Sequence, residues 1–182
     1  MVTKRHDEAI GSQAVVRSTG RPREEWHELL DTAGATGWPH KRIAEWLVTE
    51  HAVDGWWAQS LTVGYEQARG MRQPGQRPDG TFDANVSRTV AAGVQDVSAL
   101  VSDDARVAAW VGEGWHVASS SPGKRARLES DDGSRALIEL TAISAEKSRA
   151  AVQHMRLPDS EAVGEWKAFW KDALGRLVAQ LG

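Results

Sequence analysis

The 182-residue sequence predicts an α+β protein with two domains: a three-helix domain, then one in which a long C-terminal helix covers a short curved antiparallel sheet. Apolar residues recur at helical spacing before residue 70, alternate as in half-buried strands from residue 81, and return to helical spacing near the C-terminus. Between these patterns, residues 71–80 hold two prolines and two glycines, which disfavour helix and central strand. We therefore predict domains at residues 1–70 and 81–182, joined by a linker at residues 71–80.

Two helices are expected early in the first domain. Residues 22–33 are predicted to be helical because Pro22 suits a helix start, and Glu24 and Glu25 favour the positive end of the helix dipole. A second helix is predicted from Pro39 to about residue 51. The inward faces of both helices follow a helical period, through Trp26, Leu29, Leu30 and Ala33, then Ile43, Trp46 and Leu47.

A third helix is predicted over residues 55–68, with Asp54 as its cap. Its apolar face completes a core of three helices through Trp57, Leu61, Gly64, Tyr65 and Ala68. A minor turn at residues 12–17 is expected to pack on this core. Residues 1–10 are expected to be mobile, so that ordered structure begins near residue 11.

The last two of these helices also permit a helix-turn-helix interpretation, in which residues 55–69 would read DNA. That helix offers bases and phosphates only Gln59, Gln67 and Arg69, and it carries the acidic Glu66. The charge balance also disfavours nucleic acid, since residues 1–70 hold 8 basic and 10 acidic side chains and residues 81–182 hold 12 and 14. A DNA-binding regulator is therefore kept only as an alternative.

The segment TGRPREEWHELLDTAGATGWPHKRIAEWLVTEHAVDGWWAQSLTVGYEQARG resembles a bacterial helical domain family of unknown function. The WWAQ-x-LTVGYEQARG ending, Trp56 to Gly70, carries most of the likeness. The resemblance implies a helical module and no activity.

The second domain is predicted to begin with a strand from Phe82, followed by helical pieces at residues 94–101 and 104–111. Four strands are then expected, separated by turns of which Asp132-Gly133 is the strongest, at residues 115–120, 124–129, 134–143 and 147–157. The closing helix is predicted over residues 159–181. Alternation places one apolar face of the last two strands inward, through Ala136, Ile138, Leu140, Ala142, Ala150, Val152 and His154.

This order of elements is that of a helix-grip domain. The segments VQDVSALVSDDARVAAWVGEG, RARLESDDGSRALIEL and SRAAVQHMRLPDSEAVGEWKAFWKDALGRLVAQL resemble the START-like, SRPBCC superfamily, in the branch named for homologues of the heat-shock ATPase activator. The resemblance implies binding of a small hydrophobic molecule between sheet and long helix. We count about five strands, whereas the superfamily usually has six or seven, so the implied cavity is expected to be shallow or filled.

Candidate ligand-binding residues follow from this resemblance together with the predicted inner face. They are Trp110, Trp115, Leu128, Ile138, Leu140, Val152, His154, Trp166 and Phe169. The alternative is that the same side chains form solid core, since nine tryptophans must give two small domains dense interiors.

Catalytic and metal chemistry is not indicated. Cysteine is absent, the six histidines show no metal-ligand spacing, and no nucleophile elbow, phosphate loop or dinucleotide fingerprint occurs. Paired carboxylates fall at predicted helix starts and turns, where capping explains them. We expect a protein that is not an enzyme and holds no metal or cofactor.

Trp56 is the candidate interaction residue, because its neighbour Trp57 turns inward and leaves Trp56 outward. A protein-interaction or chaperone-associated module is accordingly the second hypothesis. No apolar run has the length of a signal peptide core or a membrane span, so a soluble cytoplasmic protein without a membrane partner is expected.

Overall fold

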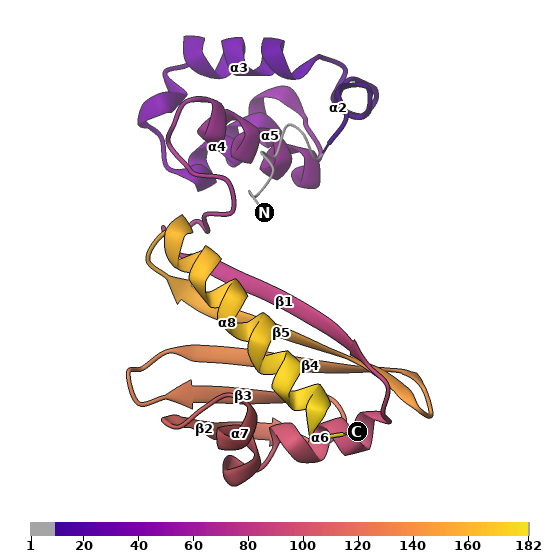
Figure 1. The fold of residues 1–182 in the computed structure, drawn as a ribbon. Coiled ribbons are helices and arrows are strands. Elements are labelled where there is room, and N and C mark those ends of the chain that lie inside the picture. The colour runs from indigo at the N-terminus through magenta and orange to yellow at the C-terminus, as the bar shows by residue number, and fades with distance from the viewer. Residues whose placement is uncertain (1–9, 182) are drawn as a thin grey trace. The chain divides into compact units, whose positions relative to one another are not determined.

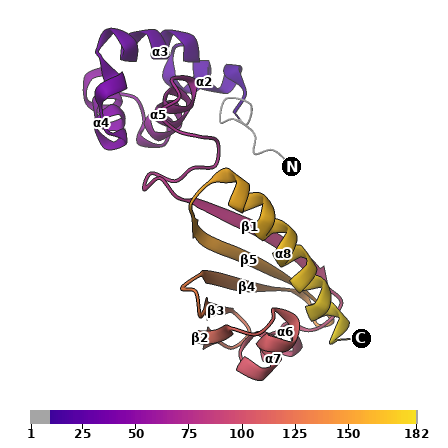
Figure 2. The same ribbon diagram turned by 60° about the vertical axis from the view of Figure 1, so that its left-hand side comes forward.

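The computed structural model describes residues 10–181, which fall into two compact units that divide between Gly80 and Thr81 (Figures 1 and 2). Almost all of the segment predicted to be mobile, residues 1–10, lies outside the described residues. No helix within residues 10–181 combines the length and apolar character needed to cross a bilayer.

The regular elements described in the first unit are all helices. Its elements are α2 (Ser12–Thr19), α3 (Arg23–Thr32), the short 3-10 helix η1 (Ala35–Gly37), α4 (His40–His51) and α5 (Gly55–Ala68). Asp54 caps α5 by accepting a hydrogen bond from the backbone N–H of Trp56 at 3.0 Å, as the sequence predicts. The core is formed by Val15, Trp26, Leu30, Ala35, Ile43, Leu47, Val53, Ala58, Leu61 and Tyr65.

Residues 71–80, which we call the strap, form no helix or extended strand, yet they bond closely to α5 and to one another. The backbone N–H groups of Met71 and Arg72 donate to the carbonyl of Glu66, at 2.8 and 3.3 Å. The Arg72 side chain reaches back to the Glu66 carboxylate (3.3 Å) and donates to the Gln76 carbonyl (2.7 Å). The strap therefore starts as a continuation of the helical unit.

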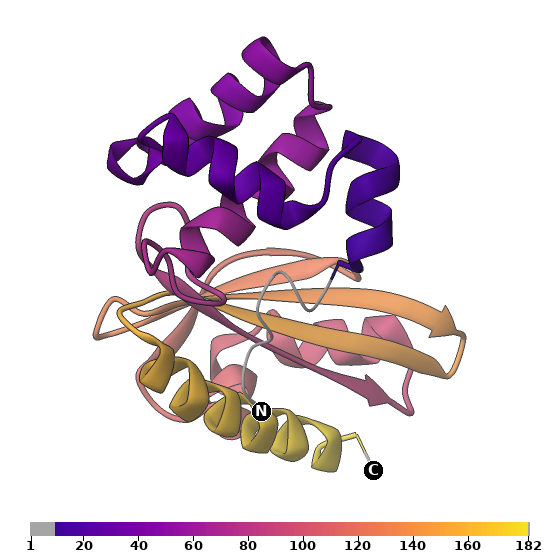
Figure 3. The same cartoon turned by 90° about the horizontal axis from the view of Figure 1, so that it is seen from above.

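The second unit confirms the predicted fold class. Five antiparallel strands form one sheet in the order β1-β5-β4-β3-β2, namely β1 (Phe82–Val90), β2 (Trp115–Ser121), β3 (Arg125–Ser130), β4 (Arg135–Ser144) and β5 (Lys147–Leu157). The helices are α6 (Val94–Val101), α7 (Asp104–Trp110) and α8 (Ser160–Ala179). Figure 3 shows α8 running along one side of the sheet, which is the helix-grip arrangement.

The core of this unit lies between the sheet and its helices. Alternate residues of β3, β4 and β5 face the helices, as the period of two predicts, and α8 contributes Trp170, Ala173, Leu174 and Leu177. Arg176 of α8 ties the layers together because its guanidinium donates to the carbonyls of Trp110 and Val111 at the end of α7.

One predicted core position is wrong. Ala142 was expected to face inward, but it is exposed, as are all residues from 141 to 147. The pairing of β4 with β5 shifts register between Ala142 and Ser144, and this hairpin projects past the helices (Figure 1). The side chains still alternate between the two faces of the hairpin there, but no described helix covers either face.

Candidate ligand-binding site

The structure brings the nine predicted ligand-binding residues into one region. Trp110, Trp115, Leu128, Ile138, Leu140 and Val152 belong to the buried core, and Trp166 and Phe169 pack against that core from α8. His154 joins them from β5 and is 1% exposed. The sequence therefore identified a real spatial cluster.

Most side chains of this cluster fill the space between the sheet and α8 that a ligand would have to occupy. The Trp170 ring lies 5.2 Å from the ring of Trp115, 5.2 Å from Phe169 and 6.3 Å from Trp110, measured between centroids. Rings at such separations are in edge contact with one another. Between the middle of α8 and the sheet, tryptophan side chains thus occupy the interior.

A pocket opens instead at one end of the layer between the sheet and α8. We call this layer the grip and the pocket the end pocket. Its volume is about 480 Å³, and it lies between the β3–β4 hairpin, the end of β5 and the first half of α8. Of the nine predicted residues, His154 and Trp166 line it. Its other lining residues are Asp132, Gly133, Ser134, Arg135, Met155, Arg156, Leu157 and Pro158.

His154 is the buried polar side chain of the end pocket. Its Nδ1 accepts a hydrogen bond from the indole N–H of Trp170 at 3.1 Å, so Nδ1 carries no proton and the neutral ring holds its proton on Nε2. Burial lowers the pKa of His154 to about 4, despite the opposing influence of Asp132 and Asp83. Among residues 10–181, no group accepts a hydrogen bond from Nε2.

Trp166 supplies the aromatic wall. Its ring lies 3.9 Å from the imidazole of His154 between centroids, with 38° between the planes, and 5.0 Å from the ring of Phe169. These contacts fix its orientation, while the side chain stays only partly buried. A planar molecule in the end pocket therefore meets an indole beside an imidazole N–H.

The hairpin wall is held by its own turn. Gly133 adopts a φ of 85°, and Asp132 accepts hydrogen bonds from the Ser130 hydroxyl and from the backbone N–H of Ser134 (2.8 Å). These bonds, with that of Ser130 first, lower the pKa of Asp132. Asp132 is therefore an ionised, fixed rim residue.

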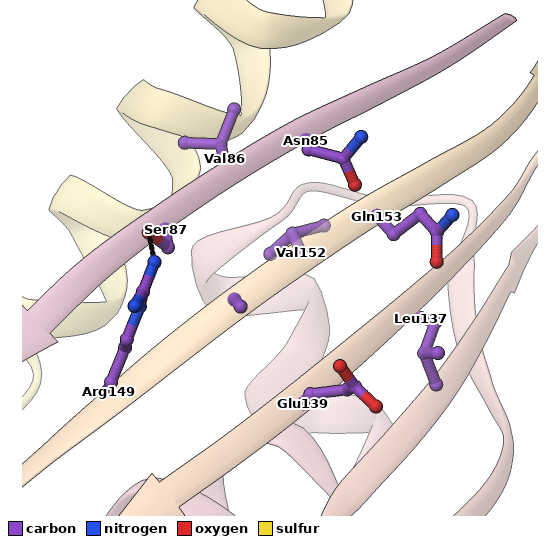
Figure 4. A pocket seen from close by; sticks show the side chains of 9 residues that line it. Asn85, Val86, Ser87, Leu137, Glu139, Arg149, Val152 and Gln153 are labelled. Atoms are coloured by element: carbon purple, nitrogen blue, oxygen red, sulfur yellow. Dashed lines mark hydrogen bonds between the residues drawn. The ribbon is translucent and has the colours of Figure 1, made fainter. Parts of the chain in front are cut away.

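A second hollow, of about 340 Å³, lies over Ala151 on the other face of the sheet (Figure 4). Arg149 donates to the hydroxyl of Ser87 at 2.7 Å, and Gln153 donates to Asp83 at 2.7 Å. Its lining within residues 10–181 includes no aromatic ring, and Val152 is the predicted residue that it includes. This hollow offers a ligand less apolar contact than the end pocket does.

The helical unit holds a third hollow, of about 310 Å³, beneath the strap. At its base, His40 Nδ1 lies 3.0 Å from the Glu66 carboxylate and its Nε2 lies 2.7 Å from Gln59 Oε1, while Arg72 pairs with Glu66 at 3.3 Å. These polar groups satisfy one another. The network therefore explains the attachment of the strap.

Trp56 is placed as the sequence predicts, on the surface of the helical unit. It is 62% exposed and packs edge-on to the ring of Trp57 at 4.8 Å.

Within residues 10–181, no group of three His, Asp or Glu side chains is arranged to hold a metal ion.

The sequence did not identify the polar rim of the end pocket. Asp132, Ser134 and Arg135 belong to a hairpin that was recognised only as a turn, and Arg156 gives no motif. The one available signal was the pairing of β4 with β5, which sets Ala136 opposite His154 and so brings the hairpin close to that histidine.

Comparisons with known proteins show similarity of fold over about half of the chain. No model of a known protein family matches it, and no curated protein does. Similar solved structures include DynU16, a protein of the dynemicin biosynthetic locus (24% identity, 54% of this chain and 46% of that chain, TM-score 0.45). Others are the Aha1 dimer from Colwellia psychrerythraea (10%, 53% and 92%, TM-score 0.45) and an AHSA1-like protein from Rhizobium etli (19%, 54% and 80%, TM-score 0.43).

The chain thus spans less than half the length of DynU16. The resemblance of the N-terminal residues to a helical domain of unknown function stays a prediction.

Proposed function

We propose that the C-terminal unit binds a small, largely apolar planar molecule in the end pocket and catalyses no reaction on it. The observation that carries the proposal is the pairing of His154 with Trp166. A buried imidazole whose Nε2–H has no acceptor among the described residues lies against an indole ring that is partly exposed in a pocket of about 480 Å³. A ring stacked on Trp166 with an oxygen near Nε2 would complement both groups.

The site differs from the one implied by the family resemblance. A ligand between sheet and mid-helix would have to displace Trp110, Trp115 or Trp170, which are 9% exposed or less. Displacing a packed aromatic side chain costs several kcal/mol, on the order of 3 to 5. Binding at the end of the grip leaves that core intact.

The chemistry of His154 supports binding rather than catalysis. A group with a pKa of about 4 is a weak base near neutral pH, and its Nδ1 is already engaged by Trp170. Among residues 10–181, no carboxylate hydrogen-bonds to this imidazole to orient or activate it. Nε2–H therefore acts as a hydrogen-bond donor.

The test uses the fluorescence of N-phenyl-1-naphthylamine, a neutral aromatic probe that brightens in apolar sites. We expect saturable binding by the wild type and a rise in melting temperature by mass action. Trp166→Leu, which keeps an apolar side chain and removes the ring, should weaken binding about tenfold, since aromatic contacts contribute about 1 kcal/mol or more.

Trp56→Leu is the matched control, because Trp56 is a tryptophan outside the pocket with 62% exposure. It should bind the probe like the wild type. Loss of binding in Trp56→Leu with retention in Trp166→Leu would move the site to the helical unit and overturn the proposal.

A second candidate role, protein docking by the helical unit, is favoured by the exposed Trp56, which packs edge-on to the half-buried ring of Trp57. Sedimentation of wild type and Trp56→Ser over a range of concentrations tests self-association through this surface. DNA reading by α5 is disfavoured because Gln59 and Glu66 are bonded to His40, and Arg69 is paired with Asp31.

A further inference from the structure

The end of β5 contains an unusual backbone conformation within the wall of the end pocket. Arg156 has a φ of 61°, in the left-handed region that side chains rarely adopt. Eleven described residues have positive φ, and nine of them are glycines. An arginine at such a position is therefore unusual in this chain. The other exception, Ala52, ends helix α4.

A β-bulge accounts for the conformation. In the pairing of β1 with β5, Phe82 lies opposite Leu157 whereas Ala84 lies opposite His154, so β5 has one extra residue in this interval. Asp83 faces the bulge. Its carboxylate accepts hydrogen bonds from the backbone N–H of Arg156 at 3.3 Å and from the Gln153 side chain at 2.7 Å.

The bulge itself does not require an arginine. Glycine would adopt the same φ without steric cost, and the bond to Asp83 uses only the backbone N–H of residue 156. A left-handed backbone conformation at a residue other than glycine lowers the stability of the fold by on the order of 1 kcal/mol or more. The backbone conformation therefore does not account for an arginine at this position. What arginine adds over glycine here is the charged guanidinium.

The charges around the end pocket set Arg156 apart. Arg135, the other arginine in the wall, pairs with Glu129 at 3.0 Å. Asp132 is committed to the hairpin turn through Ser130 and Ser134. Among residues 10–181, no carboxylate lies within ion-pair distance of Arg156, which is exposed. Among the described residues that line the end pocket, Arg156 is therefore the one cation that no carboxylate pairs with, while Asp132 adds an ionised carboxylate to the same wall.

We propose that Arg156 binds an anionic group of the molecule in the end pocket, so that the ligand class is a planar aromatic anion such as a carboxylate or sulfonate. The ring would stack on Trp166, and the anionic group would face the guanidinium, which suits planar oxyanions. This inference rests on the proposed function, because it assigns the charge of the ligand in the same pocket.

A pair of matched probes tests it. The probe 8-anilinonaphthalene-1-sulfonate differs from N-phenyl-1-naphthylamine only in its sulfonate group. We expect the wild type to bind the sulfonate about tenfold more tightly than the neutral probe at low salt, since charged hydrogen bonds contribute about one decade of affinity. Added salt should bring the ratio of the two affinities closer to one, because it screens the charge interaction.

Arg156→Gly should reduce that ratio to about one by weakening the sulfonate alone, and its melting temperature should equal or exceed that of the wild type because glycine relieves the backbone. Arg156→Asn, uncharged and tolerant of positive φ, provides a second variant. Arg156→Lys should retain most of the preference. Arg149→Gln removes an exposed arginine of the same strand on the other face of the sheet, where it donates to the Ser87 hydroxyl, and should change the ratio less than twofold.

The outcomes separate the two proposals. Equal binding of both probes by the wild type, or an unchanged ratio in Arg156→Gly and Arg156→Asn, would overturn the anion site and leave the end pocket as a site for neutral molecules. Binding of neither probe would overturn the proposed function and this inference with it.

Discussion

The indole N–H of Trp170, in the middle of α8, donates to Nδ1 of His154 on β5 at 3.1 Å, and both side chains are almost fully buried. The bond joins the long helix to the sheet in the middle of an otherwise apolar layer. It also fixes the tautomer of His154, so that the remaining N–H belongs to Nε2. The same contact therefore stabilises the grip and prepares the end pocket.

Trp170→Phe should destabilise the C-terminal unit by about 3 kcal/mol. The change removes the donor to a buried nitrogen, which costs about 1 to 3 kcal/mol, and leaves a small cavity. Urea unfolding at pH 7 measures the change. Trp115→Phe is the control, because Trp115 lies in the same cluster with no hydrogen bond from its indole among the described residues. Equal losses in the two variants would show that the bond contributes nothing.

The stability of the C-terminal unit should fall between pH 6.5 and 4 through His154. The folded protein keeps this ring neutral down to a pKa of about 4, whereas the unfolded chain takes up a proton near 6.5. The unfolded state thus binds more protons in that window, and stability decreases as the pH falls, by on the order of 3 kcal/mol.

Urea titrations of wild type and His154→Gln from pH 7.5 to 4 isolate this contribution, because other titrating groups are common to both proteins. The advantage of the wild type should shrink steadily below pH 6.5. An advantage that stays constant over the whole range would contradict the assignment of a buried neutral imidazole.

Glu66→Gln should release the strap. Glu66 is 6% exposed and faces both His40 and Arg72, and the Arg72 side chain is 14% exposed. Removing the carboxylate leaves the partly buried Arg72 guanidinium without its anionic partner, which costs about 1.4 kcal/mol or more. Trypsin should then cleave after Arg72 about tenfold faster, since cleavage tracks the open population.

Glu45→Gln provides the matched control for the strap. Glu45 pairs with Lys41 at 3.5 Å, but both side chains are largely exposed, so the loss should be small. Mass spectrometry of the early fragments measures cleavage after Arg72. The same rate in wild type and Glu66→Gln would mean that the carboxylate does not hold the strap.

Local patterns predicted the elements because each pattern has a local cause. The five strands follow from alternation and from turns such as Asp132-Gly133, and Asp54 identifies the start of α5. The same reasoning failed at Ala142, where alternation continues although the covering helices have ended. Burial depends on a second layer, which the strand itself does not encode.

The site was predicted only in part for a related reason. The nine residues could be grouped by their inward positions, but the open end of the grip depends on how large side chains share the interior. Trp115 and Trp170 fill the middle, and Trp166 stays at the edge. The bulge at Arg156 and the network around Glu66 join residues distant in sequence, and neither has a sequence signature.

The most direct test of binding in the end pocket follows the nine indole N–H signals of the protein by NMR during titration with 1-naphthol, a planar molecule with one oxygen. Assignment uses single Trp→Phe variants. We predict saturable shifts that are largest for Trp166, weaker for Trp170 through its bond to His154, and absent for Trp56. Unchanged spectra, or shifts confined to Trp56 and Trp57, would contradict binding beside His154 and Trp166.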